Sequence, residues 1–112
     1  MKGGESVSVG PITPQEVEQH YLPVFNEIYT TINEILIDRY DFENVRFNVN
    51  RDIIEATIAR CENDSERARQ LSEVFESSDW IYKIISDYEA VGWKVEHDYI
   101  IAGLPRLVFT RA

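Results

Sequence analysis

The chain has 112 residues, of which 44% are hydrophobic and 12% aromatic, and its formal net charge at pH 7 is -9. This length fits one domain with a single core, and the apolar fraction argues against a chain that is disordered throughout. The negative charge opposes contact with DNA, RNA or an anionic membrane, because each phosphate contact requires a Lys or Arg. The acidity is typical of a solubilising surface. The more specific alternative is an acidic face that meets a basic partner or imitates nucleic acid.

The single cysteine, Cys61, allows no intramolecular disulfide, which fits a reducing compartment. No apolar run approaches the roughly 20 residues of a membrane span. The first residues, "MKGGESVSVG", lack the apolar segment of a signal peptide. We therefore expect a protein that is neither secreted nor held in a membrane.

Residues 1–12 contain Gly and Ser and are predicted to form a flexible or docking arm. Thr13 begins the first helix, because Pro14 follows at the first helical position and Glu16 completes a capping box. Pro23 lies inside this helix and has no N–H to donate, so we expect a kink or a break there. The apolar residues recur at helical spacing, at Val17, Tyr21, Val24, Ile28, Ile32 and Ile35.

The middle of the chain predicts one strand followed by short helices. Residues 45–49 alternate apolar and polar side chains, which is the period of a half-buried strand. Asn50 is the expected N-cap of the next helix, with Asp52 in its first turn, where a negative charge suits the helix dipole. Further helices are predicted to begin near Ser65 and near Ser77.

The end of the chain predicts a hairpin. Gly92 is the expected C-terminal cap of the preceding helix, residues 93–99 alternate cleanly, and residues 107–110 form the last strand. Together the elements predict an α+β domain over residues 13–112, with a long N-terminal helix, short helices and a three-stranded antiparallel sheet that ends in the C-terminal hairpin. The expected core consists of Phe47, Trp93, Val95, Leu107 and Phe109 from the strands and Ile28, Ile32, Ile54, Ile84 and Ile85 from the helices.

The hairpin tip, "YIIAGLP", is apolar where a solvent-facing turn is usually polar. The loop folds back over the core, or the strand continues through Ile101, or Ile100, Ile101 and Leu104 form an exposed apolar knob. Such a knob is typical of an interface with a partner or with a second copy. In that case Arg106 at its edge pairs with an acid of the partner.

The sequence contains no catalytic or metal-binding motif. His20, Cys61 and His97 are scattered singly, whereas a zinc site needs clustered Cys and His. Cys61 is expected to be a buried structural thiol, and His97 and Asp98 point to opposite faces of their strand. We therefore predict no enzyme, no metal and no cofactor. An enzyme would again be a candidate if the structure placed two carboxylates, or His97 and a carboxylate, together in a deep pocket.

The predicted order of helix, strand, helices and hairpin is that of a winged helix, whose helix before the hairpin enters the major groove. A DNA-binding regulator is therefore the alternative function, with contacts from Arg46, Arg51, Arg106 and Arg111. However, the outward side of the helix before the hairpin carries one Lys against two acids. Winged helices also dock on proteins, so a protein partner or self-association is favoured over nucleic acid.

The segments "WIYKIISDYEAVGWKVEHDY" and "LVFTR" resemble small tailed-phage proteins of unknown function, in an aromatic-led helix, a Gly-Trp strand start and a closing Phe-Thr strand. The upstream "VFNEIYTTINEIL" is similar to their leading helix, whereas the "YIIAGLP" loop departs from them. The resemblance implies a phage or prophage origin, and hence the host cytoplasm or the virion. We predict a non-catalytic protein-binding module of viral type, either a virion-associated assembly component or an inhibitor that docks on a host factor.

Overall fold

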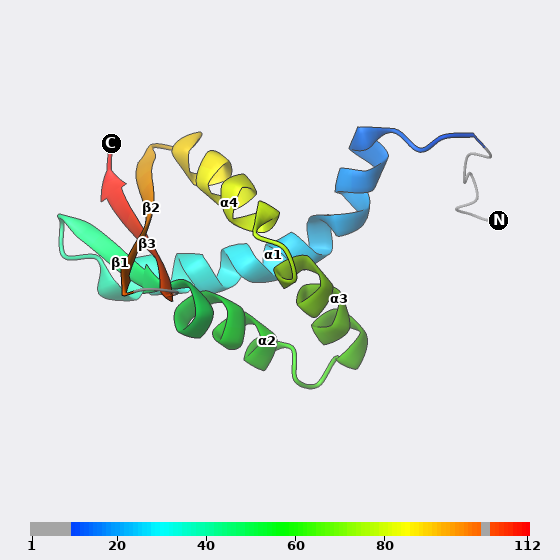
Figure 1. Cartoon of the computed structure of the whole chain (residues 1–112), viewed down its shortest axis with the longest axis horizontal. Coiled ribbons are helices and arrows are strands. Elements are labelled where there is room, and N and C mark those ends of the chain that lie inside the picture. The colour runs from blue at the N-terminus through cyan, green and yellow to red at the C-terminus, as the bar shows by residue number, and fades with distance from the viewer. Residues whose placement is uncertain (1–9, 102–103) are drawn as a thin grey trace.

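The structure is a computed structural model that describes residues 10–101 and 104–112, and the side chains of residues 99–104 lie outside this description. Figure 1 shows one long helix crossing the chain, with the strands gathered at one end of it. The α+β class and the long N-terminal helix are confirmed. In chain order the elements are α1 (Pro14–Arg39), β1 (Asn44–Asn48), η2 (Val49–Glu55), α2 (Ala56–Arg60), α3 (Ser65–Phe75), α4 (Asp79–Glu89), β2 (Trp93–Ile101) and β3 (Leu104–Arg111).

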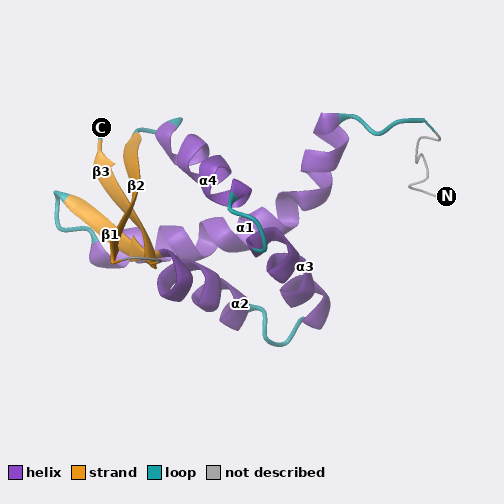
Figure 2. Cartoon of the chain, viewed as in Figure 1, coloured by secondary structure: helices purple, strands orange, loops and turns teal. Residues whose placement is uncertain are grey.

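The three strands form an antiparallel sheet in the order β1-β3-β2, as predicted. Phe47 pairs with Leu107 in the first ladder, and Val95 pairs with Phe109 in the second. The strand β2 runs on to Ile101, which was one of the alternatives for the hairpin tip. Figure 2 shows the sheet beside the C-terminal part of α1, while the first turns of α1 lie away from every strand.

The core lies between one face of the sheet and the helices. Phe47 and Phe109 are fully buried and their ring centroids lie 5.0 Å apart. Ile53 is fully buried in place of the predicted Ile54, which is only partly buried at the edge of the core. The other predicted core residues lie in this cluster or against it: Trp93, Val95, Leu107, Ile28, Ile32, Ile84 and Ile85.

The capping box of α1 is confirmed, and the helix is bent. The Thr13 N–H donates to Glu16 Oε1 at 2.9 Å, and the Glu16 N–H donates to Thr13 Oγ1 at 3.1 Å. The helix continues through Pro23 without a break. Its axis changes direction between the blue and the cyan part of Figure 1, so the predicted kink is present. The kink separates α1 into two halves with different surroundings.

The predicted N-cap Asn50 is wrong by two residues, because the cap is Asn48. Asn48 Oδ1 accepts from the Arg51 N–H at 2.8 Å, and the Asn48 N–H donates to Asp52 Oδ2 at 2.8 Å. Asp52 is buried and also accepts from Arg39, at 3.2 and 3.4 Å. The helical turn therefore starts as a wide π turn at the end of β1, and Asp52 fastens it to the last turn of α1.

Candidate docking surface

The first half of α1 extends beyond the rest of the fold. Residues 14–22 are all exposed, and Figure 1 shows this part of the helix projecting away from the sheet. Its apolar side chains remain open to solvent, with Val17 and Tyr21 each 38% and Leu22 45% exposed. From Val24 onward the same apolar stripe is buried. An apolar helix face without a covering element usually marks an interface.

The exposed stripe leads into a groove between α1, the end of α3 and the start of α4. The main hollow has a volume of about 390 Å³, and a second hollow of about 250 Å³ adjoins it, sharing Tyr21, Phe25 and Lys83 with it. We call the two hollows together the α1–α4 groove. The residues that line the groove are Val17, Glu18, Gln19, Tyr21, Leu22, Phe25, Glu73, Val74, Ser77, Asp79, Trp80 and Lys83.

The apolar wall of the groove is held rigidly. Trp80 is 4% exposed, and its ring meets that of Phe75 edge-on with the centroids 4.9 Å apart. Lys83 Nζ lies 5.2 Å from the centroid of the Phe25 ring, a cation–π contact. The same Nζ lies 3.1 Å from Asp87 Oδ2, so its charge is already paired. The wall therefore presents aromatic surface with little free positive charge.

The rim of the groove is acidic. Glu18, Glu73 and Asp79 line the groove, whereas Lys83 is the one basic residue among its described lining residues. The Glu73 carboxylate forms an ion pair with Arg69 one turn earlier in α3. Glu18 and Asp79 form no ion pair with any residue between 10 and 101 or between 104 and 112. Two carboxylates that have no ion-pair partner among the described residues thus flank the aromatic wall of the groove.

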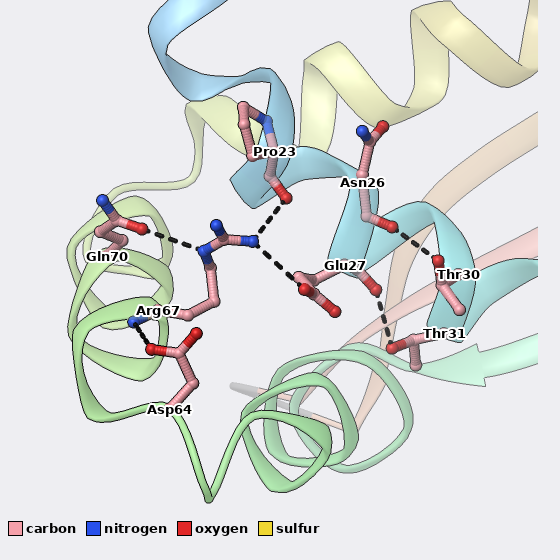
Figure 3. Close-up of polar contacts among 8 residues, drawn as sticks. All are labelled: Pro23, Asn26, Glu27, Thr30, Thr31, Asp64, Arg67 and Gln70. Atoms are coloured by element: carbon pink, nitrogen blue, oxygen red, sulfur yellow. Dashed lines mark hydrogen bonds and ion pairs between the residues drawn. The ribbon is translucent and has the colours of Figure 1, made fainter.

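Arg67 holds α3 against the bend of α1, as Figure 3 shows. Its Nη1 donates to the Pro23 carbonyl at 3.1 Å and to Glu27 Oε2 at 3.2 Å. Its Nε donates to Gln70 Oε1 at 3.1 Å, and its backbone N–H donates to Asp64 Oδ1 at 3.0 Å. The planar guanidinium thus joins the carbonyl at the kink to a side chain of each helix. This contact fixes the direction in which the first half of α1 projects.

Hydrogen bonds join α4 to the part of α1 that follows the groove. The Tyr29 hydroxyl donates to Asp87, and the Tyr88 hydroxyl donates to Asn33 Oδ1 at 2.6 Å. Burial raises the pKa of Tyr29, and the hydrogen bond to the Asp87 carboxylate raises it further. Burial likewise raises the pKa of Tyr88. Both phenols therefore stay protonated and act as fixed donors.

The predicted partner-binding residues lie on the hairpin. The side chains of Ile100, Ile101 and Leu104 fall outside the described part of the structure. Arg106 Nε and Nη2 each donate at 3.0 Å to the carboxylate of Asp98, its neighbour on the adjoining strand. The hydrogen bonds from Arg106 hold the pKa of Asp98 below its ordinary value. Arg106 is thus engaged within the chain and does not line the groove.

The scattered His and Cys residues occupy separate places. Cys61 is buried, and burial together with the nearby Glu27 raises the pKa of its thiol, as suits the predicted structural role. His97 is half-buried with its ring centroid 6.2 Å from that of Tyr82. Among the described residues, no group of three or more His, Cys, Asp or Glu side chains could hold a metal ion. In the same part of the chain, no helix is long and apolar enough to cross a bilayer.

Sequence reasoning missed the groove, because it assigned Val17 and Tyr21 to the same buried stripe as Ile28. Pro23 was the available signal, since a kink turns the residues before it away from the core that covers the residues after it. A scan against protein-family models and searches of curated proteins and solved structures find no significant match to this chain. The class that fold and surface define is an acidic α+β domain with an aromatic groove.

Proposed function

We propose that the chain is a non-catalytic protein-binding module and that its α1–α4 groove holds a basic amphipathic helix of another protein. The observation that carries this proposal is the apolar stripe of Val17, Tyr21 and Leu22, which is exposed and continuous with the buried aromatic wall at Trp80. Covering three such side chains contributes a few kcal/mol, at about 25 cal/mol per Å² of apolar surface, before ordering costs.

The shape and charge of the groove support this occupant. A groove bounded by helices accepts a further helix whose apolar face provides anchors at i, i+3, i+4 and i+7. Glu18 and Asp79 on the rim attract Lys or Arg on the flanks of that helix. A second copy of the chain fits this groove poorly, because its own exposed apolar helix, residues 14–22, carries Glu16 and Glu18 and no Lys or Arg. The partner is therefore basic where the groove is acidic.

The two carboxylates in the groove favour binding over catalysis. Glu73 and Asp79 both line it, but an enzyme would need two carboxylates that converge in a deep pocket. The Glu73 carboxylate is paired with Arg69, and the hollow is open to solvent. A general acid or base usually lies in a pocket that is closed to bulk water. These carboxylates instead suit the role of a charged rim.

The resemblance to tailed-phage proteins supports a viral setting for this module. We propose that it acts in the virion as an assembly component, or in the host cytoplasm as an inhibitor that docks on a host factor. The hairpin tip with Ile100, Ile101, Leu104 and Arg106 remains a predicted second contact with the partner. Neither setting requires a cofactor or a metal.

The test is a titration of the full chain with an amphipathic peptide of about 20 residues that has Leu at helical spacing and Lys elsewhere. A peptide of the same composition without the helical spacing is the control. We expect the tryptophan fluorescence, to which Trp80 and Trp93 both contribute, to change with the first peptide only. Leu22→Asp should weaken this binding at least about tenfold, since it buries a charged group against the apolar face of the peptide. The matched control Tyr82→Asp, exposed but outside the groove, should bind as the wild type does.

Equal binding of both peptides would contradict the proposal, because it would show that net charge alone attracts them. The proposal also fails if Tyr82→Asp weakens binding as much as Leu22→Asp does. Peptide binding that is present in the wild type and lost only in Leu22→Asp supports the groove as the docking site.

One observation favours the alternative, a winged-helix regulator that binds DNA. The sheet order β1-β3-β2, with helices between β1 and the hairpin, is the arrangement of that fold. Against it, Arg106 is paired with Asp98, and Arg51 Nε lies 3.5 Å from Asp52 Oδ1. These ion pairs leave fewer cations free to bind phosphate. Duplex binding that falls steeply with salt would support this alternative. No binding at low salt would reject it.

A further inference from the structure

The turn between α1 and β1 holds an aromatic side chain in an unfavourable backbone conformation. Phe42 has a φ of 72° and is 87% exposed. A positive φ is strained for a large side chain, and such strain often marks a functional position. The turn is fixed by Asp41 Oδ1, which accepts from the Glu43 N–H at 2.9 Å and from the Asn44 N–H at 3.1 Å. The fold thus keeps Phe42 pointing into solvent, where it contributes little to the core.

A hollow lies next to this ring. Its volume is about 450 Å³, ample for a phenyl ring, and its wall includes Tyr40, whose ring centroid is 5.2 Å from that of Phe42. Two of the aliphatic residues that line it, Ile37 and Val91, are 83% and 73% exposed. We call Phe42 and this hollow the Phe42 surface. The residues that line the hollow are Leu36, Ile37, Tyr40, Val91, Gly92, Trp93 and Arg111.

The charges of the Phe42 surface are complementary to one another. Arg111 lines the hollow, and Glu43 directly follows Phe42. Neither residue forms an ion pair with any described residue of the chain. Arg111 therefore offers a free cation inside the hollow, and Glu43 offers a free anion beside the ring. This end of the molecule has both signs of charge, unlike the acidic groove at the other end of α1.

We propose that the Phe42 surface is a two-fold interface between two copies of this chain, in which Phe42 of each copy enters the hollow of the other. A two-fold contact requires a surface that complements itself, and a protruding ring beside an apolar hollow meets this requirement. The same rotation brings Glu43 of each copy against Arg111 of the other. A stable dimer buries roughly 800 Å² per partner, so the interface also has to cover the exposed Ile37 and Val91 around the hollow.

This interface and the α1–α4 groove use different parts of the molecule. The hollow is built on the last turns of α1, whereas the groove is built on the residues around its kink. A dimer can therefore hold two partner helices at the same time. Such a bivalent molecule suits an assembly role better than a monomer does, because one dimer can join two partner molecules.

The test is sedimentation equilibrium of the full chain over a range of concentrations at about 0.15 M salt. We expect the wild type to form a dimer, and Phe42→Gly to raise its dissociation constant about 30-fold, the usual loss for a central aromatic anchor. Glycine accepts a positive φ, so at concentrations low enough for both proteins to be monomeric the melting temperature of Phe42→Gly should be unchanged or higher. A purely structural role for Phe42 would instead lower the melting temperature.

Charge reversal supplies a second, independent test. Glu43→Arg and Arg111→Glu should each weaken the dimer, because each places like charges together across the interface. The double variant restores opposite charges and should recover dimerisation to near the wild-type level. A wild type that stays monomeric throughout overturns the proposal. So does a dimer that Phe42→Gly leaves intact, or a double variant that dimerises no better than the single variants.

Discussion

The two halves of α1 have the same apolar spacing but opposite surroundings. After the kink, Ile28 and Ile32 are fully buried against the sheet and the neighbouring helices. Before it, Val17 and Tyr21 occupy the equivalent face and stay exposed. Periodicity therefore identifies the apolar face of the helix. The direction of the helix axis decides whether other parts of the chain bury that face.

The two halves also differ in how they are fastened. The C-terminal half is tied by Arg39 to the buried Asp52 and by Thr31, whose hydroxyl accepts from Thr57 at 3.0 Å. The first turn of the N-terminal half is closed by the Thr13 capping box. The two halves of α1 should therefore differ in their free energy of local unfolding. Each of the following variants tests this difference.

The largest effect is expected in the buried half. Ile28→Ala removes three side-chain carbons from a site with 0% exposure, so the free energy of unfolding should fall by about 2–5 kcal/mol. Urea unfolding followed by Trp fluorescence measures this loss. Ile28→Val, which removes one carbon, is the graded control and should cost about 0.5–1.5 kcal/mol. A loss below about 1 kcal/mol for Ile28→Ala would show that this half is not the core of the domain.

The next largest effect is expected where α1 is fastened to η2. Asp52→Asn removes the charge that meets Arg39 and the Asn48 N–H, and should cost about 2 kcal/mol at pH 7. Burial alone would raise the pKa of Asp52, but these two partners outweigh it and the pKa lies below its ordinary value. The stabilisation is therefore full above the unfolded pKa of about 4 and is lost as pH falls through the folded value.

The measurement is urea unfolding of the wild type and of Asp52→Asn at several pH values. The difference between the two proteins should be largest near pH 7 and should shrink as the solution becomes more acidic than about pH 4. A constant difference across this range would show that the charge of Asp52 is not what stabilises the contact. Asp38→Asn, which removes an exposed carboxylate one residue before Arg39, is the matched control.

Local patterns predicted the elements of this fold because their causes are local. The Thr13 capping box and the alternation around Val95 depend on neighbours in sequence, and both are present in the structure. The sequence pattern misplaces this N-cap at Asn50, because nothing in the sequence shows that Asp52 turns back to the end of β1. The sequence does not predict the positive φ of Phe42 either, since this conformation usually occurs at Gly or Asn. The groove depends on the tertiary direction of a helix, which no local pattern specifies.

A smaller and local effect is expected at the N-terminus of α1. Thr13→Ala removes the side-chain oxygen that accepts from the Glu16 N–H and should cost this helix end about 1 kcal/mol. The cost should appear as faster hydrogen exchange of the amides in residues 16–22, because few contacts hold this half. The amides of residues 28–36 are the internal control and should exchange as in the wild type. Faster exchange in both segments would show that α1 unfolds as one unit.

The smallest effect on stability is expected from Val17→Ser, and its value lies in the contrast with Val24→Ser. The two valines lie on the same helix, on either side of Pro23, with 38% and 2% exposure. Val24→Ser should cost several kcal/mol, because it leaves a cavity and a buried hydroxyl. Val17→Ser should change the free energy of unfolding by no more than about 0.5 kcal/mol, as is usual for an exposed site. It should still weaken the binding of the amphipathic peptide to the groove. If instead Val17→Ser costs as much as Val24→Ser, Val17 is already covered in solution, and the groove is not available to a partner.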